Sequence, residues 1–132
     1  MTAPQSIRVR VRYAETDRMG VVYHANYFVW FEVARCELLR RVGSSYRELE
    51  DSGVMLPVIE AHCEYRAPAR YDDELDVQAT GEMLSPARIE FRYEISRLSD
   101  GVISATGRTV HAAIDASGKP CRLPAQIQEM LR

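Results

Sequence analysis

One long apolar helix pattern limits the folds that are open to this chain. Between residues 26 and 43, large apolar side chains recur at steps of three and four, which is the spacing of a buried helix face. These side chains are Tyr27, Trp30, Phe31, Ala34 and Leu38, and the stripe is widened by Phe28, Val33 and Leu39. We therefore expect most of the helix surface to be enclosed. Asn26 is the expected N-cap and Gly43 the expected C′ residue.

Five segments with the period-two alternation of half-buried strands accompany this helix. Residues 7–13 precede it, and residues 59–66, 75–83, 89–96 and 102–114 follow it. Asp72-Asp73, Ser85-Pro86 and Asp100-Gly101 are the turn signals between the later strands. One apolar face per strand is typical of an antiparallel sheet. We predict a single α+β domain over residues 1–132, a curved five-stranded antiparallel sheet wrapped around one long central helix.

Two short helices complete the predicted elements. Ser45-x-x-Glu48 has the spacing of a capping box and opens a helix that ends near Gly53. A second short helix is expected from Pro124 to Leu131. Because the long helix is apolar on many sides and the sheet has open edges, we expect a second copy of the chain to close the core. The sequence therefore predicts a homo-oligomer.

The composition excludes several classes of protein. A length of 132 residues with 46% hydrophobic and 27% charged residues is ordinary for one soluble domain. A net charge of −2 argues against a general nucleic-acid binder. The 3 cysteines lack a C-x-x-C spacing, which favours a reducing cytoplasm over a disulfide framework. We find no membrane span, and residues 1–6 are too short and polar for a signal peptide.

The polar loop before the long helix holds the strongest candidate for chemistry. Asp17 lies there between Thr16 and Gly20, and a carboxylate at this point can meet a bound carbonyl group. The backbone N–H groups of residues 24–27 have no intrahelical partner, so they can bind an oxyanion that forms during a reaction. Gly20 allows a tight turn between the two. Two alternatives stay open: Asp17 is only a turn or capping residue, or Glu15 is the reactive carboxylate.

Other candidates have weaker support. His24 either donates to a substrate or carries a proton, and an ordinary exposed histidine is equally compatible with the sequence. His62 and His111 lie on predicted strands without nearby ligands, so we expect no metal site. Cys36 and Cys63 are interpreted as small core residues. Arginines near strand ends can meet phosphates, although solvated surface positions are the more ordinary interpretation; they are Arg66, Arg70 and Arg88.

The loop and the helix start resemble a known family. Residues 13–27 read Y-x-E-T-D-x-x-G-V-V-Y-H-x-x-Y, and an aromatic helix follows. This run resembles the hotdog-fold acyl-CoA thioesterases of the 4-hydroxybenzoyl-CoA thioesterase family, and its V-V-Y-H segment is most similar to the bacterial branch associated with the Tol–Pal system. Residues 65–75, from Tyr65 to Leu75, are also similar to a strand-and-turn region of that family.

The resemblance implies an activity and a set of site residues. Asp17 would be the nucleophile or general base on a thioester, and the backbone amide at His24 would polarise its carbonyl group. His24 would also assist thiolate departure or substrate placement. The family acts as dimers or tetramers with sites between subunits, and it uses no metal or organic cofactor, since coenzyme A is part of the substrate. The implied substrate-binding residues are Gly20, Val21, Tyr23, Asn26, Tyr27 and, for a nucleotide phosphate, Arg88.

Alternatives to this activity remain at the level of sequence. One is a hotdog hydratase or dehydratase that acts on enoyl or hydroxyacyl thioesters. Another is a non-catalytic module that binds acyl thioesters, including those of an acyl carrier protein. The sequence leaves the acyl group open, and it does not separate coenzyme A from carrier-protein esters.

Overall fold

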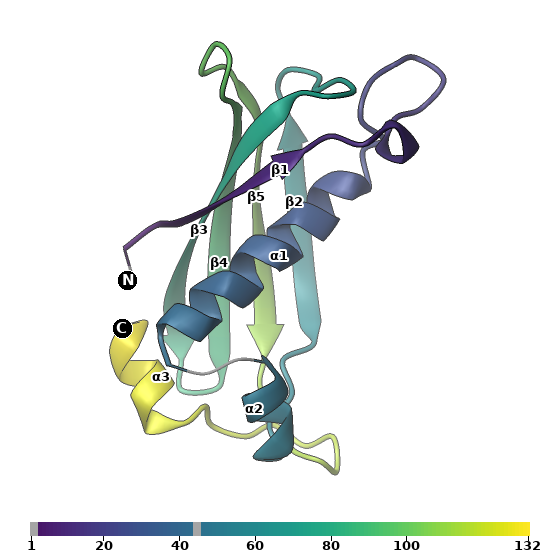
Figure 1. Ribbon diagram of the computed structural model, residues 1–132. Coiled ribbons are helices and arrows are strands. Elements are labelled where there is room, and N and C mark those ends of the chain that lie inside the picture. The colour runs from purple at the N-terminus through teal and green to yellow at the C-terminus, as the bar shows by residue number, and fades with distance from the viewer. Residues whose placement is uncertain (1–2, 44–45) are drawn as a thin grey trace.

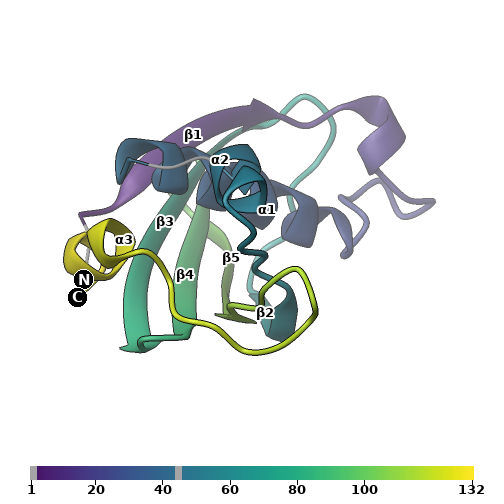
Figure 2. The same ribbon diagram turned by 90° about the horizontal axis from the view of Figure 1, so that it is seen from below.

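A computed structural model of the protein describes residues 3–43 and 46–132. Its sheet has 5 strands in the order β1-β3-β4-β5-β2, and every neighbouring pair is antiparallel. The strands are β1 (Gln5–Arg10), β2 (Val58–Tyr65), β3 (Glu74–Ser85), β4 (Arg88–Arg97) and β5 (Ile103–Ala112). The helix α1 (Asn26–Arg41) crosses one face of the curved sheet (Figure 1 and Figure 2). The predicted α+β class and the antiparallel five-stranded sheet are confirmed.

The short helices lie at the end of the sheet opposite the loop that joins β1 to α1 (Figure 1). They are α2 (Tyr46–Asp51) and α3 (Ala125–Met130), and both agree with the predicted positions. The capping box proposed for α2 begins at Ser45, which lies outside the described residues. Gly43 follows the C-cap Val42 with a φ of 103°, so its predicted role as the C′ residue of α1 is confirmed.

The buried face of α1 is the one that the spacing predicts. Tyr27, Trp30, Phe31, Ala34 and Leu38 are all buried against the sheet. Phe31 stacks on Tyr93 of β4 with ring centroids 4.3 Å apart. Gly107 of β5 permits this close packing, because a Cβ atom there would lie 2.5 Å from the Phe31 ring. Helix and sheet therefore share one hydrophobic core.

The outer face of α1 and strand β2 are more exposed than the sequence predicts. Val33 was expected to widen the buried stripe, but its side chain is 46% exposed, and Val29 beside it is 51% exposed. Both lie on the side of α1 that faces away from the sheet. Strand β2 is likewise more exposed than its alternation predicts, since all of its residues except the half-buried Cys63 are exposed. The physical reason is its place at the edge of the sheet, with a neighbour on one side only.

Strand β1 is shorter than predicted at its C-terminal end. Its ladder with β3 runs from Gln5 to Arg10, and Tyr13 begins a 3-10 turn, η1 (Tyr13–Glu15). The buried Glu15 carboxylate causes this break, because its Oε1 accepts the Arg12 N–H at 2.7 Å. The turn aims the chain away from the sheet and into the loop that carries Asp17.

Candidate active site

The loop between η1 and α1 is a closed turn that presents Asp17. The Asp17 N–H donates to the Val21 carbonyl at 2.9 Å, and the Gly20 N–H donates to the Asp17 carbonyl at 3.0 Å. The Asp17 Oδ1 accepts the Met19 N–H at 2.8 Å. Gly20 has a φ of 78°, which strongly favours glycine, so its predicted role in a tight turn is confirmed. The second carboxylate oxygen of Asp17 has no partner among the described residues.

The start of α1 leaves backbone donors free beside this loop. The Asn26 N–H donates to Tyr23 O at 2.9 Å and the Tyr27 N–H to His24 O at 3.4 Å, so these two amides are used. Within residues 3–43 and 46–132, the N–H groups of His24 and Ala25 donate to no protein group. Of the backbone N–H groups of residues 24–27 that were predicted to bind an oxyanion, only those of His24 and Ala25 are therefore free among the described residues. Both lie at the positive end of the helix dipole.

The predicted N-cap is wrong. Ala25 is the N-cap of α1, and no side chain caps it. The Asn26 side chain instead donates through Nδ2 to Glu15 O at 2.8 Å. Asn26 thereby anchors the helix start to η1, which is a different way to fix the same junction.

A pocket of about 290 Å³ opens between this loop and the end of β2. It brings together Asp17 and His24, the two residues predicted to be catalytic. Its lining residues are Asp17, Met19, Val21, Val22, His24, Tyr27, Tyr65, Arg66, Ala67 and Pro68. A carboxylate and the residue with the first free helix amide thus share one largely apolar cavity.

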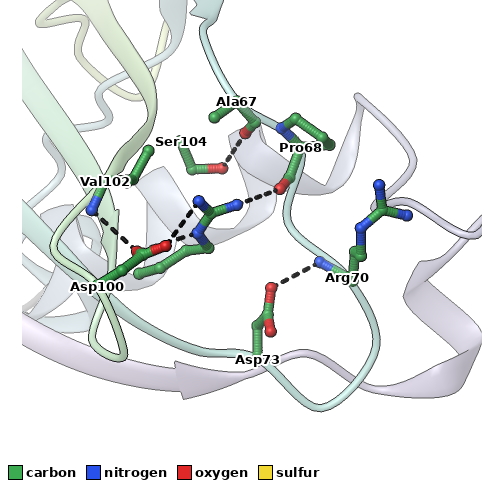
Figure 3. Close-up of polar contacts among 8 residues, drawn as sticks. Ala67, Pro68, Arg70, Asp73, Asp100, Val102 and Ser104 are labelled. Atoms are coloured by element: carbon green, nitrogen blue, oxygen red, sulfur yellow. Dashed lines mark hydrogen bonds and ion pairs between the residues drawn. The ribbon is translucent and has the colours of Figure 1, made fainter.

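The far wall of the pocket is the segment after β2, and the β4–β5 hairpin holds it in place (Figure 3). Arg97 donates to the Pro68 carbonyl at 3.0 Å and pairs with Asp100 at 2.9 Å. The Ser104 hydroxyl donates to Ala67 O at 2.7 Å. The hydrogen bond from Arg97 holds the pKa of Asp100 below its usual value. These bonds hold the wall by the backbone carbonyls of Ala67 and Pro68, and their donors, Arg97 and Ser104, are not among the lining residues.

Glu15 does not take part in the pocket. It is buried, and its carboxylate accepts the Arg12 N–H and pairs with the Arg12 guanidinium at 3.4 Å. Of the two carboxylates that the sequence left open, Glu15 is therefore committed to the 3-10 turn, and Asp17 faces the cavity.

The remaining predicted residues divide into two groups. Val21 and Tyr27 line the pocket, and the buried Tyr27 hydroxyl lies 3.3 Å from Ser104 Oγ. Tyr23 is half exposed beside the His24 ring and does not line the pocket. Arg88 begins β4, whereas the pocket wall is held at the other end of that strand by Arg97. At about 3.3 Å per residue the two arginines are roughly 30 Å apart, so Arg88 does not reach this pocket within the protomer.

Sequence reasoning missed Tyr65 as a pocket residue. Its hydroxyl donates to His24 O at 3.0 Å, and its ring packs edge-on against Tyr27 and His24. Partial burial, together with the neighbouring Cys63 thiol, raises the pKa of Tyr65 to about 12. The only available signal was its place one residue before Arg66-Ala67-Pro68, where the strand pattern stops.

Comparisons with known proteins match this chain and its fold to one family. The profile of the Thioesterase-like superfamily matches residues 11–131, which is nearly the whole chain. The chain belongs to the thioesterase-like superfamily.

Relatives and solved structures agree with this membership. The chain is 34% identical to the acyl-CoA thioester hydrolase YbgC of Escherichia coli O6:H1, covering 90% of this chain and 89% of YbgC. It superposes on Slr0204, a 1,4-dihydroxy-2-naphthoyl-CoA thioesterase from Synechocystis, with a TM-score of 0.91 at 27% identity, covering 98% and 96% of the two chains. For the DHNA-CoA thioesterase of Staphylococcus aureus the TM-score is 0.85 at 36% identity, covering 91% and 80%.

The pocket of this superfamily member is lined by the Asp17 carboxylate and by His24, and no cysteine is among its lining residues. Burial raises the pKa of both Cys36 and Cys63, so neither is a thiolate nucleophile near neutral pH. In the described part of the chain, no group of three or more His, Cys, Asp or Glu side chains is placed to hold a metal ion. No described helix is long and apolar enough to cross a membrane.

Proposed function

We propose that this protein hydrolyses acyl-CoA thioesters to a carboxylic acid and free coenzyme A. The observation that supports this most strongly is the shared pocket of Asp17 and His24. Among the described residues, one Asp17 carboxylate oxygen and the N–H groups of His24 and Ala25 at the start of α1 have no protein partner. A thioester carbonyl bound there meets a base and an oxyanion site at once. Membership of the thioesterase-like superfamily supports the same reaction.

The chemistry requires only these groups and water. In the general-base route, Asp17 removes a proton from a water molecule that attacks the thioester carbon. The carbonyl oxygen becomes an oxyanion that the N–H groups at the start of α1 stabilise, at the positive end of the helix dipole. The C–S bond then breaks, and the coenzyme A thiolate leaves and takes up the proton. In the nucleophilic route, Asp17 attacks the carbon directly, the C–S bond breaks and the coenzyme A thiolate leaves, and water then cleaves the resulting mixed anhydride to the carboxylic acid and free Asp17. His24 assists thiolate departure or substrate placement in either route, and no metal or organic cofactor takes part.

We propose that the working form is a homodimer or homotetramer with sites between subunits. Edge strand β2 has an unpaired side and exposes Val58, Ile59 and Tyr65. The outer face of α1 exposes Val29 and Val33. Burial of these side chains by a second copy would enclose the helix as a central one, and it would place the partner beside the pocket through Tyr65.

The same proposal includes finer points on the family branch, the location, the acyl group and its carrier. The V-V-Y-H segment favours the Tol–Pal-associated branch. The free cysteines Cys36, Cys63 and Cys121 favour a cytoplasmic location. The acyl group is open between aliphatic and aromatic, since YbgC is named for acyl-CoA whereas Slr0204 is named for an aromatic ester. An acyl carrier protein is an alternative carrier of the thioester.

Thiol release from a panel of esters tests the proposal. The panel contains short-chain, long-chain and aromatic acyl-CoAs, among them 1,4-dihydroxy-2-naphthoyl-CoA, and acyl carrier protein esters. Asp17→Asn keeps the side-chain shape and removes the base, so kcat is expected to fall by roughly 10²–10⁴-fold. Asp51→Asn, an exposed change at the end of α2, is the matched control and should leave kcat unchanged.

Each outcome decides between the alternatives. Release that depends on Asp17 supports a thioesterase, and the preferred ester identifies its substrate class. Near-wild-type turnover by Asp17→Asn rules out the proposed role of that residue. A change in enoyl absorbance without thiol release favours a hydratase or dehydratase, and binding of esters with neither signal favours a non-catalytic module.

A further inference from the structure

Tyr65 joins the edge strand to the start of α1 by a single hydrogen bond. Its hydroxyl donates to the His24 carbonyl oxygen at 3.0 Å across 41 residues of sequence. Its ring also packs edge-on against the His24 and Tyr27 rings, with centroids 6.2 Å and 5.2 Å apart. Figure 1 shows the corresponding elements, with the last residues of β2 beside the first turn of α1. No other described side chain contacts the His24 carbonyl by a hydrogen bond.

The His24 carbonyl belongs to the peptide group whose N–H is one of the two free donors. In a trans peptide the C=O of residue 24 and the N–H of residue 25 point in opposite directions. A bond that holds the His24 oxygen therefore also sets the direction of the Ala25 N–H. Among the described residues, the only other bond to this oxygen is the long 3.4 Å contact from the Tyr27 N–H, so the first turn of α1 restrains it weakly.

The same bond polarises the peptide. A donor on the carbonyl oxygen draws electron density toward it and strengthens the N–H of the same amide as a donor. The other free donor, the His24 N–H, belongs to the peptide group of the Tyr23 carbonyl, which accepts the Asn26 N–H at 2.9 Å. The hydroxyl group from β2 thus acts directly on the Ala25 N–H, and it acts on the His24 N–H only through the position of the helix start.

We propose that Tyr65 is a positioning residue that holds the start of α1, with its free backbone N–H groups, beside the pocket in which the thioester binds. This inference rests on the proposed function. It assigns to Tyr65 no proton transfer and no contact with the reacting atoms. The hydroxyl already donates to His24 O, and with a pKa of about 12 it stays protonated over the whole working range of pH.

Tyr65→Phe is the decisive variant, because it removes the hydroxyl and keeps the ring that lines the pocket. We expect kcat to fall by about five- to tenfold, the change that follows from the loss of one neutral hydrogen bond. KM should stay within about twofold, because the ground-state contacts of the ring remain. The shape of the kcat–pH profile should be unchanged. Tyr71→Phe, which removes an exposed hydroxyl outside the pocket, is the matched control and should keep wild-type kinetics.

A second measurement does not depend on turnover. Amide hydrogen exchange followed by NMR should be faster for Asn26 and Tyr27 in Tyr65→Phe, because the first turn of α1 loses its tie to β2. The Tyr71→Phe variant should show wild-type exchange there. Circular dichroism and thermal unfolding show whether each variant is folded.

The outcomes separate this inference from the proposed function. Wild-type kcat in a folded Tyr65→Phe variant overturns the inference and leaves the thioesterase in place. A rise in KM alone makes Tyr65 a substrate-binding residue, and a lost limb of the pH profile makes it an acid or base; both overturn the positioning role. If the wild-type protein releases no thiol from any ester, the proposed function fails, and the role of Tyr65 fails with it.

Discussion

Polar groups under the middle of α1 are joined by hydrogen bonds, whereas some polar groups at its start have no protein partner among the described residues. Under the middle, Arg35 donates to the Tyr93 hydroxyl at 3.1 Å, and that hydroxyl lies 2.6 Å from Thr109 Oγ1. Thr109 Oγ1 lies 2.9 Å from His111 Nε2, and His111 Nδ1 lies 2.9 Å from Leu56 O. At the start of the helix, by contrast, two backbone N–H groups and one carboxylate oxygen have no protein partner among the described residues.

The donor and the acceptor of every bond in this buried hydrogen-bond network follow from its last member, the Leu56 carbonyl oxygen. A carbonyl oxygen can only accept, so His111 Nδ1 carries the proton and Nε2 accepts from Thr109. Thr109 then accepts from Tyr93, and Tyr93 accepts from Arg35. No buried side-chain N or O atom in the described part of the chain is left without a partner. Against this background, unpartnered groups gathered at one pocket indicate a place reserved for a ligand.

Removing Thr109 from the middle of this hydrogen-bond network should have the largest effect on stability. Thr109→Val keeps the shape of the side chain and removes the hydroxyl, which leaves Tyr93 and His111 each without one partner. At about 1–3 kcal/mol for each such buried group, we expect the free energy of unfolding to fall by about 4 kcal/mol. Chemical denaturation measures this. Thr106→Val on the same strand is the control and should change stability by less than about 0.5 kcal/mol. An equal loss of stability in both variants would contradict the proposed network in which every buried polar group has a partner.

The second effect is a loss of stability in acid that is carried by His111. Burial lowers the pKa of His111 from 6.5 to about 4 in the folded protein. As pH falls from 6.5 toward 4, the unfolded chain binds a proton that the native protein excludes, so stability decreases over this window and levels off below it. The shift corresponds to about 3 kcal/mol. We expect the difference in unfolding free energy between wild type and His111→Asn to shrink by this amount across the window; a difference independent of pH would show that His111 is not held neutral.

The fold was predictable from the sequence because it follows from periodicity. The spacing of Phe31 and Leu38 gave the buried face of α1, and the alternation in β3 and β4 gave their buried sides. The exposure of Val33 and of β2 was not predictable in this way. Periodicity reports which side chains are apolar, but it does not report whether another element of the same protomer covers them.

The site was predictable only in part, for a similar reason. Asp17 and the helix start lie within one short segment, so local reasoning brings them together. The choice between Asp17 and Glu15 required the bond from Arg12 to Glu15, which a sequence does not display. Tyr65 was missed because its contact with His24 spans 41 residues and ends on a backbone atom, which leaves no side-chain pattern to recognise.

The smallest predicted effect comes from alanine substitution of a glycine in the pocket loop. It is compared with the same substitution in a loop of similar backbone conformation elsewhere. Gly20 and Gly118 have φ values of 78° and 85°, and a Cβ atom at either would meet no atom within 4 Å. Alanine at each position should therefore cost about 1 kcal/mol of stability through backbone strain alone. The two variants should differ in turnover, because the Gly20 turn fixes Asp17 whereas the Gly118 turn lies in the loop before α3. We expect thiol release to slow severalfold in Gly20→Ala and to stay at the wild-type rate in Gly118→Ala. Equal rates in these two equally destabilised proteins would mean that the exact position of the Asp17 loop does not limit the reaction.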